Sequence, residues 1–384
     1  MSSNPTTDRP GVAPQFLFIV GAPRSANSPT LATLDGHPDI LAWPIEFPYF
    51  VYFNGVANGR KKVPIDEINR VILNELEVAL NDKLKLDAGT DAPVFALGDT
   101  IGDLDTQTLI GHLDRDRDTH LGAVDYLKYL FESLKVAHAK YADRPVKYFA
   151  MNLTARGMDW ENDRLMESSR FLFPYRDMVE SYASIREKGL KADTPPQFFA
   201  LGAKKGSLYW LQTFQRVSQL AERHVGRENF FVVSFGRVRQ DPDAVISEMC
   251  TFLDIGYDPA LSHLSIAGKS HGGNAYEAEM NKGTYAPRSS KLSIPLSSFE
   301  ESMLASLDLY DFDEGKRLRT GFGPLAMART AFTSAFSELY DRADSAWKGT
   351  GEPCSLLNRL KLSLRLAGIY FALRKGIMSR LVPR

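Results

Sequence analysis

The segment FLFIVGAPRSANSPTLATLDGHPDI, residues 16–40, constrains the fold more than any other part of the chain. It opens with a continuous apolar run, Phe16–Val20, which is typical of a strand buried on both faces of a parallel sheet. A Gly-Ala-Pro-Arg-Ser turn follows, and Ser28 and Pro29 favour the first positions of a helix, so we expect a helix to begin at about Ser28. A strand, a tight turn and a helix in this order predict an α/β fold with a ligand-binding turn at the carboxyl edge of the sheet.

Apolar runs and stretches of helical spacing alternate along the rest of the chain. Further buried strands are predicted at Val146–Met151, Arg170–Phe173 and Asn229–Val233. Helices are predicted at Asp66–Lys85, about 121–141, Arg176–Lys188 and Asp241–Leu253. Strands that alternate with long helices indicate a P-loop-like central parallel sheet flanked by helices.

The composition divides the chain into four regions. We expect a disordered lead-in over residues 1–14, an α/β domain over 15–310, a helical extension over 311–353 and a basic apolar helix over 354–384. The last region has seven Lys or Arg and no Asp or Glu. Its charges scatter around the helical wheel, so docking on the protein itself, docking on a partner and peripheral contact with an anionic membrane all stay open.

Several function classes are disfavoured by the overall numbers. A net charge of −1 argues against a general nucleic-acid binder, which needs a basic face. The seven histidines form no HExxH pair and there are two cysteines, so no metal site is expected. The polar N-terminus lacks the apolar core of a signal peptide, and no stretch approaches the ~18 apolar residues of a spanning helix. We therefore expect a cytoplasmic protein.

The turn itself has the features of an anion site. The N–H groups and the positive dipole end of the helix point back into the loop, and Arg24 adds a planar cation suited to phosphate or sulfate oxygens. Ser25, Asn27 and Ser28 offer further hydrogen-bond donors. The residues alone leave an alternative open, in which Arg24 pairs with a surface carboxylate and the turn serves only the backbone.

Three motifs resemble those of one family. VGAPRSANSPTLATLDGHPDI is similar to the 5′-phosphosulfate loop of the sulfotransferases, with a motif layout nearest to the carbohydrate and tyrosylprotein enzymes. FLFPYRDMVESY and FFVVSFGRVRQDPDAVISEMCTFLDI resemble the later motifs of that family, and the likeness spans about residues 15–310. Because the Gly-Lys pair of a nucleotide-binding Walker loop is missing, a P-loop kinase fits less well.

The resemblance implies a cosubstrate and residues that hold it. The cosubstrate would be 3′-phosphoadenosine-5′-phosphosulfate (PAPS), with no metal, and its sulfuryl group would pass to an acceptor hydroxyl, most simply on a carbohydrate or glycolipid. Arg24 and Ser28, with the backbone of Ser25, Ala26 and Asn27, would hold the 5′-phosphosulfate. Ser181 would bind the 3′-phosphate, with Arg176 as the nearest cation.

The resemblance also implies catalytic residues. Glu46 stands where carbohydrate sulfotransferases keep a general base, and Arg24 would stabilise the charge that builds on the bridging oxygen. The aromatic residues around Glu46 in the sequence are expected to desolvate the carboxylate and to stack on a sugar; they are Trp43, Phe47, Tyr49 and Phe50.

The chain departs from the family pattern in four features. Ala26 replaces a loop glycine, Pro29 removes one N–H from the helix start, and Phe173 stands where an arginine begins the 3′-phosphate motif. Asn152 and Thr154 occupy the stretch in which a lysine would meet the bridging oxygen. Two interpretations follow: a divergent sulfotransferase with relocated contacts, or a non-catalytic or altered-chemistry binding protein on the same fold.

Overall fold

The computed structural model describes most of the first 270 residues and a short stretch near residue 310. The described residues are 13–22, 24–88, 92–153, 163–177, 180–182, 184, 206–270, 309–313, 315–318, 360 and 364. The strands of the main sheet are β1 (Gln15–Val20), β2 (Ile40–Glu46), β7 (Tyr148–Leu153), β8 (Ser169–Tyr175) and β9 (Phe230–Ser234). The helices are α1 (Asn27–Leu34), α2 (Tyr49–Ala57), α3 (Ile65–Ala88), α4 (Thr106–Leu113), α5 (Ala123–Ala137), α6 (Asp163–Ser168), α8 (Gly206–His224), α9 (Phe235–Gln240) and α10 (Pro242–Leu253).

Short antiparallel pairs and one turn of 3₁₀ helix complete the described elements. The pairs are β3 (Val63–Pro64) with β6 (His120–Leu121), β4 (Thr100–Ile101) with β5 (Leu104–Asp105), β10 (Ser265–Ile266) with β11 (Lys269–Ser270), and β12 (Leu309–Asp311) with β13 (Lys316–Leu318). The 3₁₀ turn is η3 (Pro259–Ser262). The β12–β13 pair lies at the start of the segment predicted as a helical extension, and nearly all the rest of 311–384 lies outside the described residues.

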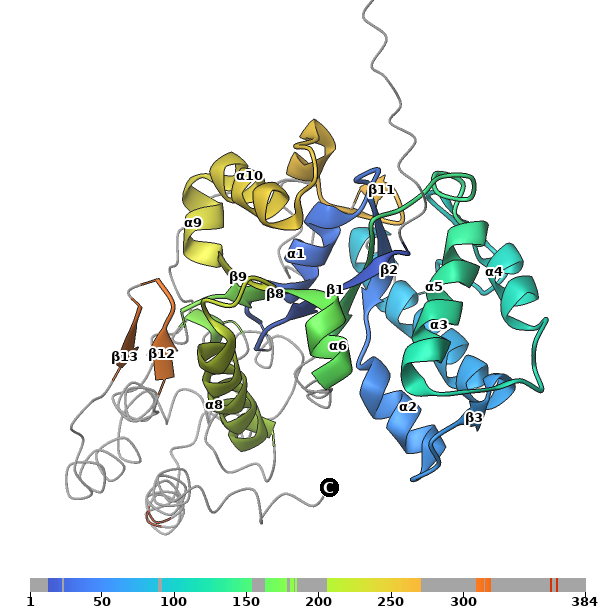
Figure 1. The fold of residues 1–384 in the computed structure, drawn as a ribbon, viewed down its shortest axis with the longest axis horizontal. Helices are drawn as coiled ribbons and strands as arrows, with labels where there is room; N and C mark the ends of the chain where they lie inside the picture. The colour runs from blue at the N-terminus through green and yellow to red at the C-terminus, as the bar shows by residue number, and fades with distance from the viewer. Residues whose placement is uncertain are drawn as a thin grey trace, which may run out of the picture.

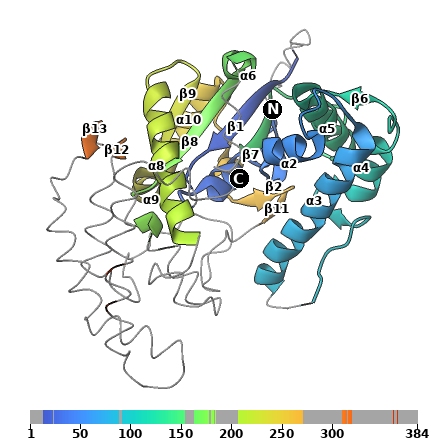
Figure 2. The same cartoon turned by 90° about the horizontal axis from the view of Figure 1, so that it is seen from below.

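The central sheet has five strands in the order β2–β7–β1–β8–β9, and every neighbouring pair is parallel (Figures 1 and 2). The prediction of a parallel α/β sheet is therefore confirmed. β1 is the central strand, and the chain builds β2 and β7 on one side of it before it builds β8 and β9 on the other. The carboxyl end of β1 thus lies where strand connections diverge, which is the usual place for a ligand in such sheets.

Helices cover both faces of the sheet (Figure 1). On one face α1, α9 and α10 pack against alternate strand residues such as Leu17, Ile19 and Ala150. On the other face α2, α3, α5 and α8 pack against the remaining set, and Figure 2 shows α2 to α5 grouped beside the β2 edge. Because side chains alternate along a strand, each buried strand supplies both cores, which explains its continuous apolar run.

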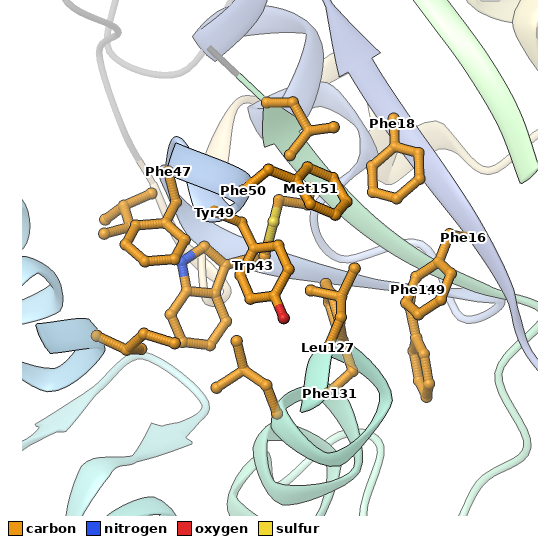
Figure 3. Packing of buried hydrophobic residues seen from close by; sticks show 14 of the residues in the cluster. Phe16, Phe18, Trp43, Phe47, Tyr49, Phe50, Leu127, Phe131, Phe149 and Met151 are labelled. Carbon is orange, nitrogen blue, oxygen red and sulfur yellow. The ribbon is translucent and has the colours of Figure 1, made fainter. Parts of the chain in front are cut away.

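Aromatic rings dominate the second of these cores (Figure 3). Phe16 and Phe18 of β1 stack with ring centroids 5.6 Å apart, and Phe131 of α5 stacks on Phe149 of β7 at 4.9 Å. Burying a side chain of this size contributes about 1.5–3 kcal/mol relative to leaving it exposed. The core fixes β1 and β7 in register and so fixes the position of the residues that follow them.

A polar cluster lies where the β10–β11 pair meets the β4–β5 pair. The buried carboxylate of Asp35 accepts hydrogen bonds from Ser265 Oγ and from the Gly268 N–H at 2.9 Å. Burial raises the pKa of Asp35, although these two donors oppose the rise.

Nearby, His138 is 3% exposed and its Nδ1 accepts a hydrogen bond from the Lys140 N–H, so this nitrogen carries no proton. Burial lowers the pKa of His138 to about 4 from 6.5, with Asp103 opposing the shift and Lys140 adding to it.

We expect the folded state to lose stability as the pH falls from about 6.5 to 4. In this window an unfolded chain protonates His138 while the folded chain keeps it neutral, so the folded state binds fewer protons. The loss attributable to His138 is about 2–3 kcal/mol between pH 7 and 4.5. Urea unfolding of wild type and His138→Gln at pH 7 and pH 4.5 measures this loss as the difference between the two proteins. The contribution of Asp35 cancels in that difference, because both proteins contain it. The matched control is His120→Gln, which replaces an exposed histidine, and the effect of His138→Gln is compared with it.

Candidate functional site

The turn after β1 holds two non-glycine residues in the left-handed region of the backbone. Arg24 has φ 68° and Ala26 has φ 73°. This conformation costs an L-residue with a Cβ atom about 1–2 kcal/mol, and such strain persists where the surrounding structure enforces it, often at ligand sites. Ala26 thus adopts the glycine-like backbone that the loop requires, at an energetic cost.

The helix start agrees with the prediction to within one residue, but Ser28 is not its N-cap. α1 begins at Asn27, with left-handed Ala26 as its N-cap and no side-chain cap, rather than at Ser28. Pro29 is consequently the third helical residue, where an N–H would in any case lack an acceptor within the helix. The N–H groups of the first turn point out of the N-terminus of the helix toward the loop, as the anion hypothesis requires.

Asn27 ties the loop to the strand. Its Nδ2 donates to the carbonyl oxygens of Gly21 at 3.0 Å and of Ala22 at 3.3 Å, while the Ser25 N–H donates to the Ala22 carbonyl at 3.1 Å. A Cβ atom on Gly21 would lie 2.1 Å from Asn27 Oδ1, so only glycine permits this approach. Asn27 Oδ1 itself is buried and has no hydrogen-bond partner among the described residues. The loop is thus held by hydrogen bonds from the side chain of Asn27 and from the backbone of Ser25.

Replacing Ala26 by glycine is expected to raise the free energy of unfolding by about 0.5–1 kcal/mol. Glycine removes the left-handed strain, and part of this gain is offset by the greater freedom of glycine in the unfolded chain. Urea unfolding measures the change. The matched control is Ala32→Gly in the regular part of α1, which should destabilise the protein by about 1 kcal/mol. A destabilised Ala26→Gly protein would contradict the assignment of strain at this residue.

Arg24 contacts the helical residues that follow β8, the strand next to β1 in the sheet. Its Nε and Nη2 donate to the hydroxyl of Ser184 at 3.2 and 3.1 Å, so the fork of the guanidinium holds a partner 160 positions away in the sequence. Ser184 lies three residues after Ser181, and residues three apart share one face of a helix. The contact therefore places the first and second sequence motifs at the same edge of the sheet.

Glu46 ends the edge strand β2 beside the loop. Ser28 Oγ donates to its Oε2 at 3.4 Å. Between Ala42 and Glu46 the pairing of β2 with β7 shifts, so that four steps along β2 match two steps along β7. A bulge of this kind redirects the side chains after it, and here it brings the carboxylate next to the start of α1.

The aromatic residues expected around Glu46 do not surround it. Glu46 is exposed, whereas all four rings lie in the core and are at most 5% exposed: Trp43, Phe47, Tyr49 and Phe50 (Figure 3). The prediction that they desolvate the carboxylate and stack on a sugar is therefore wrong. The physical reason is the alternation of the strand, which directs Trp43 and Ile45 into the aromatic core on the face away from α1.

The predicted 3′-phosphate residues lie in a charged cluster after β8. Ser181 is fully buried and its Oγ has no hydrogen-bond partner among the described residues. Next to it, Glu180 accepts from Arg176 Nε at 3.1 Å and from Arg239 at 3.3 and 3.4 Å. Both guanidinium groups lie over the ring of Phe235, at 5.3 and 5.7 Å from its centroid. Two guanidinium groups and the carboxylate that they share thus lie beside a buried hydroxyl.

Two residues of this site were not found from the sequence. Arg239 comes from α9, and its proximity to Arg176 depends on the pairing of β8 with β9. Ser184 could have been suspected, because it repeats a serine three residues after Ser181 on a predicted helix. His37, by contrast, packs away from the loop, with its Nε2 2.9 Å from the Gly256 carbonyl oxygen.

Within the described parts of the chain, no group of three or more His, Cys, Asp or Glu side chains is arranged to bind a metal ion. No helix among the same residues is both long and apolar enough to cross a bilayer.

The chain is similar to solved sulfotransferase structures at low sequence identity. The sulfotransferase domain from the curacin biosynthetic pathway is 16% identical with a TM-score of 0.43, covering 77% of this chain and 97% of that one. The sulfotransferase domain from the Synechococcus PCC 7002 olefin synthase is 14% identical with a TM-score of 0.40, covering 95% of this chain and 98% of that one. A sulfotransferase from Mycobacterium avium is 14% identical with a TM-score of 0.33, covering 65% of this chain and 66% of that one.

No curated protein matches the chain. The profile described as the sulfotransferase family matches residues 14–259, which include β1, the loop, Glu46, both later motifs and α10. This match spans more than half of the 384 residues. The chain therefore belongs to the sulfotransferase family.

Proposed function

We propose that the protein transfers a sulfuryl group from PAPS to an acceptor hydroxyl on a carbohydrate or glycolipid. Membership of the family supports sulfuryl transfer, and the donor and acceptor are the proposed part. The observation that carries the proposal is the contact between Arg24 and Ser184, because it joins the loop motif to the helix that bears Ser181. A donor with a phosphosulfate at one end and a 3′-phosphate at the other needs both motifs at one edge of the sheet.

The residues present fit such a donor. Arg24 and the first-turn N–H groups of Ala26, Asn27 and Ser28 would hold the phosphosulfate, with Ser25 buried beneath as part of the loop. The buried hydroxyl of Ser181, which has no hydrogen-bond partner among the described residues, and the guanidinium groups of Arg176 and Arg239 would meet the 3′-phosphate. Arg239 would supply the cation that is missing from the 3′-phosphate motif, where Phe173 stands in place of an arginine.

Transfer also needs a group that takes the acceptor proton. Glu46 Oε2 lies 3.4 Å from Ser28 Oγ, so the carboxylate stands beside the groups that would hold the sulfuryl end of the donor. As the acceptor oxygen forms its bond to sulfur, Glu46 would accept the hydroxyl proton. The bond between sulfur and the bridging oxygen breaks, and adenosine 3′,5′-bisphosphate leaves with the electron pair while Arg24 stabilises its charge.

Calorimetry with adenosine 3′,5′-bisphosphate and with ADP tests the donor. A PAPS-dependent enzyme should prefer the bisphosphate by at least tenfold, since each charge-assisted contact to the 3′-phosphate is worth about 1.5–3 kcal/mol. Preference for ADP would indicate a kinase, and binding of neither would remove the proposed donor. Binding of the bisphosphate without turnover on any glycan would favour the non-catalytic alternative. Location in the cytoplasm and membrane contact through 354–384 remain predictions from the sequence.

A further inference from the structure

Asn152 near the end of β7 is a polar residue in an otherwise apolar, fully buried strand. Its side chain is inaccessible to solvent, and neither Oδ1 nor Nδ2 has a hydrogen-bond partner among the described residues. An unsatisfied buried polar group is costly, and a leucine of similar volume would fill the position without that cost. Most buried polar groups in native proteins are paired, so an unpaired one calls for an explanation.

The register of the sheet places this carboxamide between the two parts of the candidate site. Asn152 is paired with Ile19 of β1 on one side and with Glu46 of β2 on the other. Its backbone is also engaged, because the Phe47 N–H donates to its carbonyl oxygen at 3.1 Å. The sheet therefore fixes Asn152 between Glu46, on the neighbouring strand β2, and the end of β1 that leads into the loop.

The alternation of β7 decides which face the side chain occupies. Tyr148 and Ala150 pack in the cluster that contains Leu31 and Leu34 of α1, whereas Met151 packs in the aromatic core on the opposite face. Asn152 follows Ala150 by two residues and so lies on the α1 face, nearer to the carboxyl edge. This is the face on which Ser28 of α1 contacts Glu46.

We propose that Asn152 is a substrate-contacting residue whose Nδ2–H donates to an oxygen of the transferred sulfuryl group. The inference rests on the proposed function and adds a neutral donor to it. A fixed amide dipole stabilises the charge that redistributes over the sulfuryl oxygens and needs no reorganisation at the moment of transfer. A carboxamide does not titrate, so its contribution is independent of pH.

The test separates a ligand contact from a packing role by two readouts. Asn152→Leu should leave the ligand-free protein at least as stable in urea, because it removes an unsatisfied amide. Its turnover with PAPS should fall about a hundredfold, the usual effect of deleting one such donor. Affinity for adenosine 3′,5′-bisphosphate should stay within about threefold of wild type, since that product lacks the sulfuryl group. The matched control is Met151→Leu, which changes the neighbouring buried side chain on the other face and should retain turnover.

Each outcome has a definite consequence. Retained turnover in a folded Asn152→Leu protein that binds the bisphosphate overturns the contact and leaves the proposed function intact. Loss of stability together with turnover shows a structural role and also overturns it. If the leucine variant does not fold, the isosteric Asn152→Asp puts a carboxylate against an anionic group and must lower turnover; full turnover would overturn the proposal. A wild-type protein that fails to bind the bisphosphate removes the proposed function and this inference together.

Discussion

Arg24→Ala is expected to weaken binding of adenosine 3′,5′-bisphosphate at least a hundredfold. The guanidinium already holds a hydroxyl with Nε and Nη2, which is the forked geometry that a phosphate or sulfate oxygen pair accepts. Arg24→Ala would remove two charge-assisted contacts between the guanidinium and the anion, each worth about 1.5–3 kcal/mol of binding free energy. We therefore expect a larger loss of affinity than from any other single substitution in the loop. Isothermal calorimetry on the full chain measures it.

The design of this experiment benefits from the backbone of Arg24. Alanine keeps the same left-handed strain, because it also carries a Cβ atom, so Arg24→Ala tests the charge without changing the loop. Arg24→Lys keeps the charge but loses the fork and should recover part of the affinity. The control is Arg60→Ala, which removes an exposed arginine paired with Glu67 and should bind as wild type does. Unchanged affinity in Arg24→Ala would show that the anion binds elsewhere.

The sheet was largely predictable from the sequence because its strands are buried on both faces. β1, β7, β8 and β9 read as continuous apolar runs, and each was expected within two residues of its observed start. β2 was not expected. Pro44 lies in the middle of it and two residues are extra in its pairing with β7, so its identity as a strand depends on the neighbour and not on its own pattern.

The start of α1 shows how tertiary structure overrides a local preference. Serine followed by proline is a good helix start, yet the loop needs Asn27 inside the helix so that its amide turns back to Gly21 and Ala22. The left-handed backbone of Ala26 makes this possible. Nothing in the spacing of these residues reveals that conformation, because alanine seldom adopts it.

Part of the candidate site was proposed from the sequence, but its arrangement was not. Motif resemblance pointed to Arg24, Glu46 and Ser181, while the partners that join them come from distant segments: Ser184 by way of Arg24, and Arg239 by way of Glu180. Sequence neighbours were misleading around Glu46, since the strand directs Trp43 into the core and leaves the carboxylate exposed. Contacts of this kind depend on strand order and register, which a single sequence does not display.

Glu46→Gln is expected to keep donor binding and lose turnover by about a hundred- to ten-thousandfold. The side-chain oxygen of glutamine still accepts the hydrogen bond from Ser28 Oγ, so the start of α1 and the loop keep their geometry. Glutamine cannot take the acceptor proton, and the loss therefore falls on the chemical step and not on affinity. Single-turnover kinetics with PAPS and an excess of acceptor measure that step, and calorimetry with the bisphosphate measures binding.

The carboxylate of Glu46 is exposed, so its role must be distinguished from a general effect of surface charge. Glu132→Gln removes one exposed carboxylate from α5, on the opposite face of the sheet, and should leave both readouts unchanged. Retained turnover in Glu46→Gln would assign the proton to another group and leave Glu46 as a residue that only positions Ser28. Loss of donor affinity together with turnover would instead place Glu46 in the binding of the donor, because a base that acts only on the acceptor hydroxyl has no reason to change it.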